Sequence, residues 1–208
     1  MQSNRHRRVA ALMAALVWWL IHSVAAAGTP PPPARTTIAM IIAPAQFRDE
    51  ELLVPKKYFE QAHCTVRVFS TTTNAVTGML GAQVRPDALL ASLDVRAFDA
   101  LVFVGGRGAQ TYWNDPRCHA LCRAALAQGK VLGAECIAPV ILARAGVLSN
   151  VTATVFPGVK DELRAGKARY TPNAVACAGR IVTSDGPASA AAFAQELLRV
   201  LRPAPVTP

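Results

Sequence analysis

Short, almost uninterrupted apolar runs recur along this chain, separated by segments whose apolar residues have helical spacing. The clearest runs are residues 36–43 (TTIAMIIA), 100–104 (ALVFV) and 131–134 (VLGA). A strand that is covered on both faces has such a run, because neither of its sides meets water. Alternation of strands and helices is typical of a mostly parallel sheet with helices on both faces. The sequence therefore predicts an α/β domain with a mostly parallel central sheet.

The other expected elements continue this alternation. The segment 74–86 is polar and contains glycine, which indicates a hairpin excursion or short edge strands. Pro55 is compatible with a helix at this position only if it falls in the first turn. Two late strands are expected to pair around Gly179. Further strands are expected over residues 65–70, 152–155, 175–177 and 181–183, and helices over 49–62, 118–128, 138–145, 159–165 and 188–201.

The first residues of the chain have the pattern of an export signal. Three arginines precede an apolar stretch at residues 9–21, and a run of small residues ends at Ala27. A basic segment, an apolar core and an A-x-A site are the parts of a secretory signal. We therefore expect a signal peptide at residues 1–27, with an uncleaved anchor as the alternative. The apolar stretch is shorter than the roughly 20 residues that a membrane span needs.

The rest of the chain divides into three parts. Residues 28–35 contain four consecutive prolines and are expected to form a stiff, extended spacer. Residues 36–201 are long enough for one domain with a substantial core, and residues 202–208 form a tail. We expect a periplasmic or secreted protein, with no stable membrane insertion after cleavage of the signal.

The charge of the chain does not indicate a nucleic-acid partner. The formal net charge is +9, and the arginines of the predicted signal supply part of it. The other arginines are dispersed, without the basic and aromatic stripe that nucleic-acid recognition favours. We therefore expect no nucleic acid, and a small molecule or an oxidant as the partner.

The chain has five cysteines, an odd number, so at least one thiol is unpaired or pairs between chains. Four of them are expected to pack in the core or on a helix face: Cys64, Cys118, Cys122 and Cys177. Their spacing does not match a zinc site, and His119 beside Cys118 is not enough for one. We expect neither a metal ion nor a cofactor.

Cys136 has a different setting from the other four cysteines. It lies between an apolar run that predicts a buried strand and a segment that predicts a helix. A cysteine at the N-terminus of a helix is close to free N–H groups and to the positive end of the dipole, which favour the nucleophilic thiolate. The alternative is a small, buried, inert side chain.

Two other features are expected at the same edge of the sheet, because sites in such folds form beyond the carboxyl ends of the strands. Glu51 follows the first strand, and the apolar residues after it indicate that it points inward. A carboxyl buried beside a thiolate has a raised pKa and can donate or shuttle a proton. Gly105 and Gly106 end another strand, where a tight turn leaves N–H groups free to bind an oxyanion.

These pieces resemble the PfpI/DJ-1 superfamily, which is related in fold to the class I glutamine amidotransferases. The resemblance implies a flavodoxin-like three-layer sandwich with a cysteine nucleophile elbow. It implies that Cys136 is the nucleophile, that Glu51 is its protonated carboxyl partner, and that Gly106 and the N–H of Ile137 line an oxyanion pocket. It also implies a homodimer or a higher homo-oligomer. The matching pieces are residues 51–55 (ELLVP), 99–106 (DALVFVGG), 134–139 (AECIAP), 145–148 (AGVL), 156–161 (FPGVKD) and 183–187 (TSDGP).

The chain also departs from the pattern of this superfamily. Protease-type members have a histidine where this chain has Ile137, and redox-protective members have a histidine near the site, where this chain has Phe156. Asp185 replaces a frequent arginine. The mature-chain histidines, His63 and His119, fall on helices away from the expected pocket. The usual Cys-His pair is therefore absent, and Cys136 is left with Glu51.

Four functions fit this pattern. The first is a cysteine-dependent enzyme that acts on small reactive carbonyls, in the manner of a glyoxalase, with Cys136 and Glu51 as its catalytic residues. The second is a non-catalytic redox sensor or stress-protective protein, in which Cys136 is oxidised. A cysteine peptidase is less favoured because of Ile137. A domain that binds a ligand without chemistry is the fourth.

Overall fold

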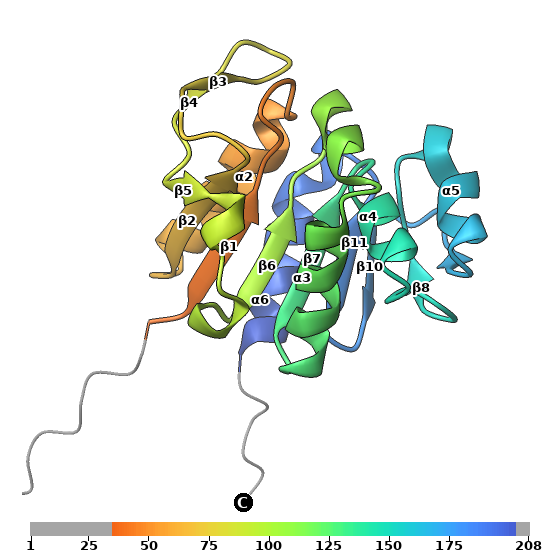
Figure 1. Cartoon of the computed structure of the whole chain (residues 1–208). Helices are drawn as coiled ribbons and strands as arrows, with labels where there is room; N and C mark the ends of the chain where they lie inside the picture. Colours follow the sequence, from red (N-terminus) through yellow and green to blue (C-terminus); the bar gives the residue numbers. More distant parts are fainter. Residues whose placement is uncertain (1–34, 203–208) are drawn as a thin grey trace, which may run out of the picture. The chain divides into compact units, whose positions relative to one another are not determined.

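The computed structural model describes residues 35–202 (Figure 1). The predicted signal peptide at residues 1–27 lies outside the described residues, as do most of the predicted spacer and most of the tail. The domain boundaries expected there stay predictions. Within residues 35–202, no helix is long and apolar enough to cross a membrane.

A seven-stranded sheet forms the centre of the domain, in the order β10-β11-β7-β6-β1-β2-β5. All neighbouring strands are parallel except β10 and β11, which form an antiparallel hairpin around Gly179. The expected α/β class and mostly parallel sheet are confirmed. The strands are β1 (Thr37–Ile41), β2 (Thr65–Ser70), β5 (Ala88–Leu89), β6 (Ala100–Phe103), β7 (Val131–Glu135), β10 (Val175–Ala178) and β11 (Ile181–Ser184).

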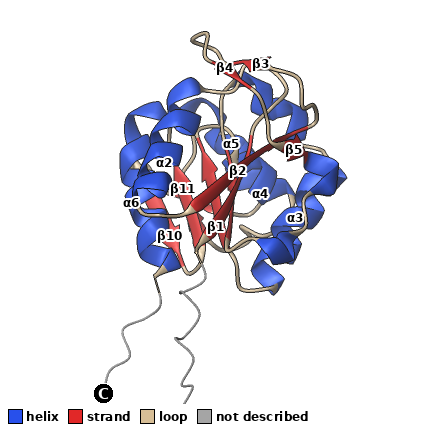
Figure 2. Cartoon of the chain, turned by 90° about the vertical axis from the view of Figure 1, so that its left-hand side faces the viewer, coloured by secondary structure: helices blue, strands red, loops and turns tan. Residues whose placement is uncertain are grey.

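Helices cover both faces of this sheet (Figure 2). Helices α2 (Asp49–Gln61) and α6 (Ala190–Leu201) pack together on one face, where Phe59 and Phe193 are fully buried. Helices α3 (Pro116–Ala127), α4 (Pro139–Arg144) and α5 (Lys160–Ala165) contribute to the core on the other face. The two apolar clusters, one on each face of the sheet, make the flavodoxin-like sandwich of three layers that the sequence predicted.

The small elements match the expected pattern only in part. The segment 74–86 does form a hairpin, β3 (Val76–Thr77) with β4 (Gln83–Val84). The strand expected over residues 152–155 is shorter, β8 (Thr152–Ala153), and pairs with β9 (Arg169–Tyr170) outside the central sheet. The 3-10 helix at Arg107–Tyr112 was not expected.

Pro55 lies in the interior of α2 rather than in its first turn, so the condition set on it from the sequence is not met. Proline has no N–H, and the main-chain carbonyl of Glu51 therefore lacks the helical partner it would have four residues later. The helix continues because burial of Leu52 and Phe59, both fully inaccessible, stabilises it by more than one lost hydrogen bond costs.

The cysteines other than Cys136 differ in their surroundings. Cys118 and Cys122 are completely buried on the inner side of α3, as expected. Cys64 is partly buried beyond the end of α2. The expectation for Cys177 was wrong, because its side chain is exposed on the edge strand β10, where its sulfur lies 3.7 Å from Arg199 Nη2. All five cysteines are free thiols.

Candidate functional site

Cys136 occupies the turn between β7 and α4 and has a left-handed backbone, with φ of +56°. Main-chain hydrogen bonds fix this turn on both sides. The Cys136 N–H donates to the Ser184 carbonyl (2.9 Å), and the Cys136 carbonyl accepts from the Phe156 N–H (2.8 Å). Trp113 Nε1 donates to the carbonyl of Ile137 (3.1 Å). A left-handed conformation is costly for a residue with a side chain, and these bonds keep the sulfur in a partly exposed position at the edge of the sheet.

Glu51 lies in the first turn of α2, with its carboxyl against the Cys136 sulfur and no exposed surface. Neither carboxyl oxygen has a hydrogen bond of good geometry to residues 35–202. Gly105 makes this approach possible. A Cβ added there would lie 2.3 Å from Glu51 Oε2 and 2.6 Å from Cys136 Cβ. The absence of a side chain at Gly105 therefore leaves the space in which the carboxyl and the cysteine meet.

Gly106 and Ile137 direct main-chain N–H groups toward the Cys136 sulfur, and both groups lower the pKa of the thiol. Gly106 has φ of +93°, and an added Cβ would lie 2.3 Å from the Arg48 main-chain nitrogen. Glycine is therefore required there for two separate reasons. The structure thus brings Cys136, Glu51, Gly105, Gly106 and Ile137 into one cluster.

The electrostatics of the cluster differ from the expectation for the cysteine. Burial, followed by the negative charge of Glu51, raises the pKa of Cys136 to about 12 and outweighs the two N–H groups. The expected preference for the thiolate was wrong for the resting site, because α4 begins only at Pro139 and its first turn does not compensate for burial beside a carboxylate. Burial also raises the pKa of Glu51, to about 7, so both forms of this carboxyl are populated at neutral pH.

Glu135 is a further buried acid, which the sequence analysis missed. It ends β7 directly before Cys136 and is completely inaccessible. Burial, followed by the charge of Glu51, raises its pKa well above the ordinary range, while the neighbouring Ser184 hydroxyl lowers it by less. Neither carboxyl oxygen has a well-formed hydrogen bond within the described residues. The available signal was a charged residue type at the end of an apolar strand that is covered on both faces, because either side of such a strand is buried.

A cavity of about 570 Å³ opens beside Cys136. Two arginines, Arg48 and Arg107, contribute to its wall; Arg48 Nε pairs with Glu50 Oε2 at 2.9 Å. Gly106, Gln110 and Gly158 also contribute. The other lining side chains are apolar: Met79, Ile137, Phe156, Val159 and Pro187. Most of these lie on segments distant in the sequence, so the sequence pattern alone did not assemble the cavity.

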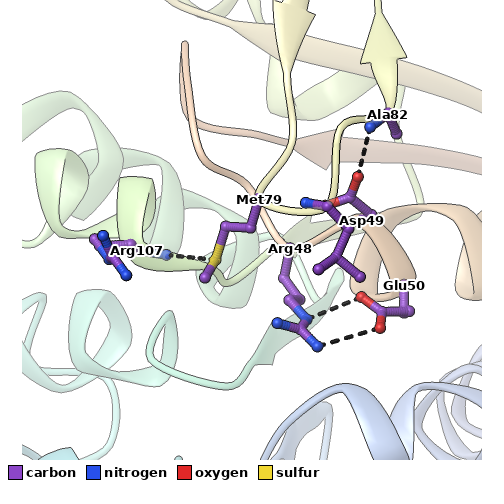
Figure 3. Close-up of polar contacts among 7 residues, drawn as sticks. Arg48, Asp49, Glu50, Met79, Ala82 and Arg107 are labelled. Carbon is purple, nitrogen blue, oxygen red and sulfur yellow. Dashed lines mark hydrogen bonds and ion pairs between the residues drawn. The ribbon is translucent and has the colours of Figure 1, made fainter.

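Asp49 anchors the β3–β4 hairpin beside this cavity (Figure 3). Its carboxylate accepts the N–H groups of Leu80 and Ala82, both at 2.8 Å. Burial raises the pKa of Asp49, but these bonds outweigh it and the pKa lies below its ordinary value. Met79 directly precedes Leu80 and lines the cavity. Its sulfur accepts a hydrogen bond from the main-chain N–H of Arg107 (3.3 Å). Asp49 therefore holds one wall of the site in place through the hairpin.

We expect Asp49→Ala to lower the free energy of unfolding by about 3 kcal/mol, because two hydrogen bonds to a buried charged acceptor are lost at about 1.5–3 kcal/mol each before partial compensation by water. Urea denaturation would measure it. Glu50→Ala is the matched control, since its half-exposed pair with Arg48 is worth at most about 1 kcal/mol. Equal effects of the two substitutions would contradict the anchoring role.

Several other polar residues lie apart from this cluster. Tyr112 is buried and donates to the Ile42 carbonyl (3.0 Å), so it packs in the core. His119 Nε2 contacts the Trp113 carbonyl (2.8 Å), and neither His119 nor His63 lines the cavity. Asp185 accepts a hydrogen bond from the Ser189 hydroxyl near the start of α6. Across the described part of the chain, no group of three or more His, Cys, Asp or Glu side chains is placed to hold a metal ion.

The fold and the cysteine at the carboxyl end of a central strand define a class of flavodoxin-like proteins. A model of the DJ-1/PfpI family matches residues 36–200, and the chain belongs to this family. The crystal structure of a ThiJ/PfpI domain protein from Brachyspira murdochii superposes with a TM-score of 0.78 at 34% identity, covering 80% of this chain and 97% of that one.

Two relatives have names that state an activity. A deglycase of Pyrococcus horikoshii is 28% identical over 163 residues, which are 78% of this chain and 98% of that protein. A glutathione-independent glyoxalase of Caenorhabditis elegans, DJR-1.2, is 27% identical over 164 residues, which are 78% of this chain and 88% of that protein.

Proposed function

We propose that this protein converts small 2-oxoaldehydes into 2-hydroxy acids without an external thiol, with Cys136 as the nucleophile and Glu51 as the group that moves the protons. One observation carries the proposal: a buried carboxyl with a pKa of about 7 lies against a thiol at the wall of a cavity. A carboxyl with a pKa near neutrality can both accept and return a proton at working pH. The activity of the nematode relative supports the same chemistry.

The proposed reaction begins from the neutral thiol and the Glu51 carboxylate, because the pKa of Cys136 is higher than that of Glu51. Sulfur attacks the aldehyde carbon and forms a C–S bond, and its proton passes through Glu51 to the former carbonyl oxygen. The N–H groups of Gly106 and Ile137, which point toward the sulfur, would stabilise the oxyanion that develops there. The product of this step is a hemithioacetal on Cys136.

Glu51 next removes the hydrogen on the carbon bonded to sulfur, as a proton, and the electron pair left behind forms an enediolate with its negative charge on the oxygen of the neighbouring carbon. Return of that proton to the neighbouring carbon, with transfer of the hydroxyl proton from the sulfur-bearing carbon to the neighbouring oxygen, gives a thioester. Water then cleaves the C–S bond, the 2-hydroxy acid leaves, and a proton returns to the sulfur. The net change is the addition of one water to the 2-oxoaldehyde, with no external oxidant or reductant. The chemistry therefore needs only the groups of this cluster and one water molecule.

We expect wild-type protein to form lactate from methylglyoxal and Cys136→Ala to form none above the uncatalysed rate, because the C–S bond cannot form. Chromatographic measurement of lactate would test this. Cys177→Ala is the matched control, since Cys177 is a free thiol exposed on the edge strand, and its rate should equal that of wild type. Equal rates in all three proteins would refute the proposal, provided that thermal melts show each to be folded.

The pH dependence of kcat/KM should report Glu51. We expect kcat/KM to rise with pH through about 7, since the carboxylate form accepts the thiol proton and the pKa of Glu51 is about 7. In Glu51→Gln we expect a rate lower by about 100- to 10,000-fold and no such rise. Rate profiles from pH 5 to 9 would measure both. If kcat/KM of Glu51→Gln still rises with pH through about 7, the titrating group is not Glu51.

The redox-sensing alternative has less support. Selective oxidation requires an accessible thiolate, and Cys136 is only partly exposed, with its pKa raised to about 12. Glu51 would have to be protonated before an appreciable thiolate could form. A role as a peptidase has less support, because Ile137 supplies no base.

Export to the periplasm or out of the cell remains a proposal, which is supported by the basic, apolar and small-residue pattern of residues 1–27. The homodimer or higher homo-oligomer implied by the resemblance stays a prediction. Neither is needed for the chemistry proposed at Cys136.

A further inference from the structure

The cavity beside Cys136 is large and mainly apolar for a site that acts on a small aldehyde. Its volume of about 570 Å³ lies within the range of about 300–1,000 Å³ that takes drug-sized ligands. A three-carbon aldehyde fills a small part of it. The side chains that line it include Ile137, Phe156 and Val159, all on the segments that directly follow or contact Cys136.

Main-chain contacts hold this apolar wall at the reacting sulfur. The Phe156 N–H donates to the Cys136 carbonyl (2.8 Å), and the Val159 N–H donates to the Phe156 carbonyl (3.0 Å). The ring of Phe156 lies over Gly158, because a Cβ added at Gly158 would be 2.8 Å from Phe156 Cε1. A side chain at position 158 would displace the ring, so Gly158 leaves the space that the ring occupies.

Phe156 is nevertheless 46% exposed, whereas Ile137 beside it is 8% exposed. A large aromatic side chain that is held at the cavity wall and left half exposed gains stability when an apolar group covers it. A polar or very small substrate would leave this apolar surface exposed to water.

We propose that the preferred substrates are 2-oxoaldehydes with an extended alkyl or aryl substituent, which lies against Phe156, Ile137 and Val159 while the aldehyde carbon meets Cys136. This inference rests on the proposed function and specifies its substrate class. The substituent takes no part in bond changes, so the reaction itself is the one described above. Binding energy from the substituent would hold the aldehyde at the sulfur.

The size of the effect follows from the apolar area that is buried. Each additional buried methylene should raise kcat/KM about 4-fold, which corresponds to about 0.8 kcal/mol. We therefore expect kcat/KM to rise at least 30-fold from methylglyoxal to the straight-chain 2-oxoaldehyde with three more methylenes. The same reactive group throughout the series keeps intrinsic reactivity nearly constant.

The test measures kcat/KM along this alkyl series for wild type, Phe156→Ala and Leu80→Ala. Leu80 is the matched control, because it is an apolar side chain, 63% exposed, on the hairpin and does not line the cavity. The rise should persist in Leu80→Ala and shrink by about 10-fold or more in Phe156→Ala. Activity that does not depend on chain length in wild type would overturn the inference and leave the proposed function intact.

A second measurement separates the inference from the proposed function. Two unreactive ketones, acetone and hexan-2-one, would compete with maleimide for the site at Cys136. Mass spectrometry would measure the rate at which maleimide labels Cys136. Hexan-2-one should slow labelling of wild type at a concentration at least 10-fold lower than acetone does. If no 2-oxoaldehyde is turned over, the proposed function fails, and equal protection by the two ketones would then overturn the apolar site as well.

Discussion

Gly105→Ala should abolish activity on 2-oxoaldehydes and lower the free energy of unfolding by about 3 kcal/mol, the upper part of the range for overpacking a filled interior. The added methyl carbon would lie 2.3 Å from Glu51 Oε2, 2.6 Å from Cys136 Cβ and 2.6 Å from the Glu135 carbonyl oxygen. Two of these neighbours belong to the reacting pair, and the third is main chain that cannot rotate away. Relief of the clash must therefore separate Glu51 from Cys136.

Gly179→Ala is the control for this substitution. Gly179 lies in the β10–β11 turn with φ of +60° and open space around it. An alanine there should cost about 1–2 kcal/mol of backbone strain and leave kcat/KM unchanged. Urea denaturation and lactate formation would be measured for both variants. Wild-type activity in folded Gly105→Ala would show that the Glu51 carboxyl does not occupy the place assigned to it.

The stability of the protein should fall as pH rises from about 4.5 to 7, and Glu51→Gln and Glu135→Gln should each reduce that fall. Burial raises the folded-state pKa of both carboxyls above the ordinary value of about 4.3. The folded state then holds protons that the unfolded state has released, so the free energy of unfolding decreases with pH. Each retained proton contributes about 1.4 kcal/mol per pH unit.

Glutamine resembles the protonated acid and has no charge to bury. At pH 4.5 each variant should match wild type. At pH 7 Glu51→Gln should be more stable than wild type by about 3 kcal/mol, and Glu135→Gln should also be more stable than wild type. For Glu51 the difference should level off above pH 7, its folded-state pKa. For Glu135 the difference should also grow in favour of the variant as pH rises above the ordinary range of a glutamate, because burial raises its pKa. Urea denaturation from pH 4.5 to 8 would measure both differences.

The matched control for these variants is Glu50→Gln, which changes the neighbouring carboxylate of the same helix turn, half-exposed and paired with Arg48. Loss of that pair should change stability by at most about 1 kcal/mol. Destabilisation of Glu135→Gln at pH 7 would show that Glu135 is ionised and paired in the folded protein, contrary to its buried, unpartnered position.

The sequence was most informative about the elements that form locally. Apolar runs such as residues 36–43 mark strands covered on both faces, and the structure has β1 there, between β2 and β6. Cys136, Glu51 and Gly106 could be placed at one edge of the sheet, since each follows a strand and the carboxyl ends of parallel strands meet there. Periodicity and position relative to strand ends were enough for this.

Other features of the site depend on contacts between segments far apart in the sequence. Glu135 directly follows the strand predicted at residues 131–134, and only the tertiary structure shows that it shares a buried region with Glu51. The bonds from Asp49 to the hairpin could not be inferred, because a carboxylate in the first turn of a helix already has a local reason to be there.

The sequence by itself determined the α/β class, the order of the main elements and the residues that meet at the edge of the sheet, because side-chain periodicity and strand ends are local properties. The tertiary structure decided the protonation of Cys136 and Glu51 and the apolar character of the cavity. A pKa depends on how completely neighbouring segments exclude water from a group. A cavity depends on which distant side chains face the same space.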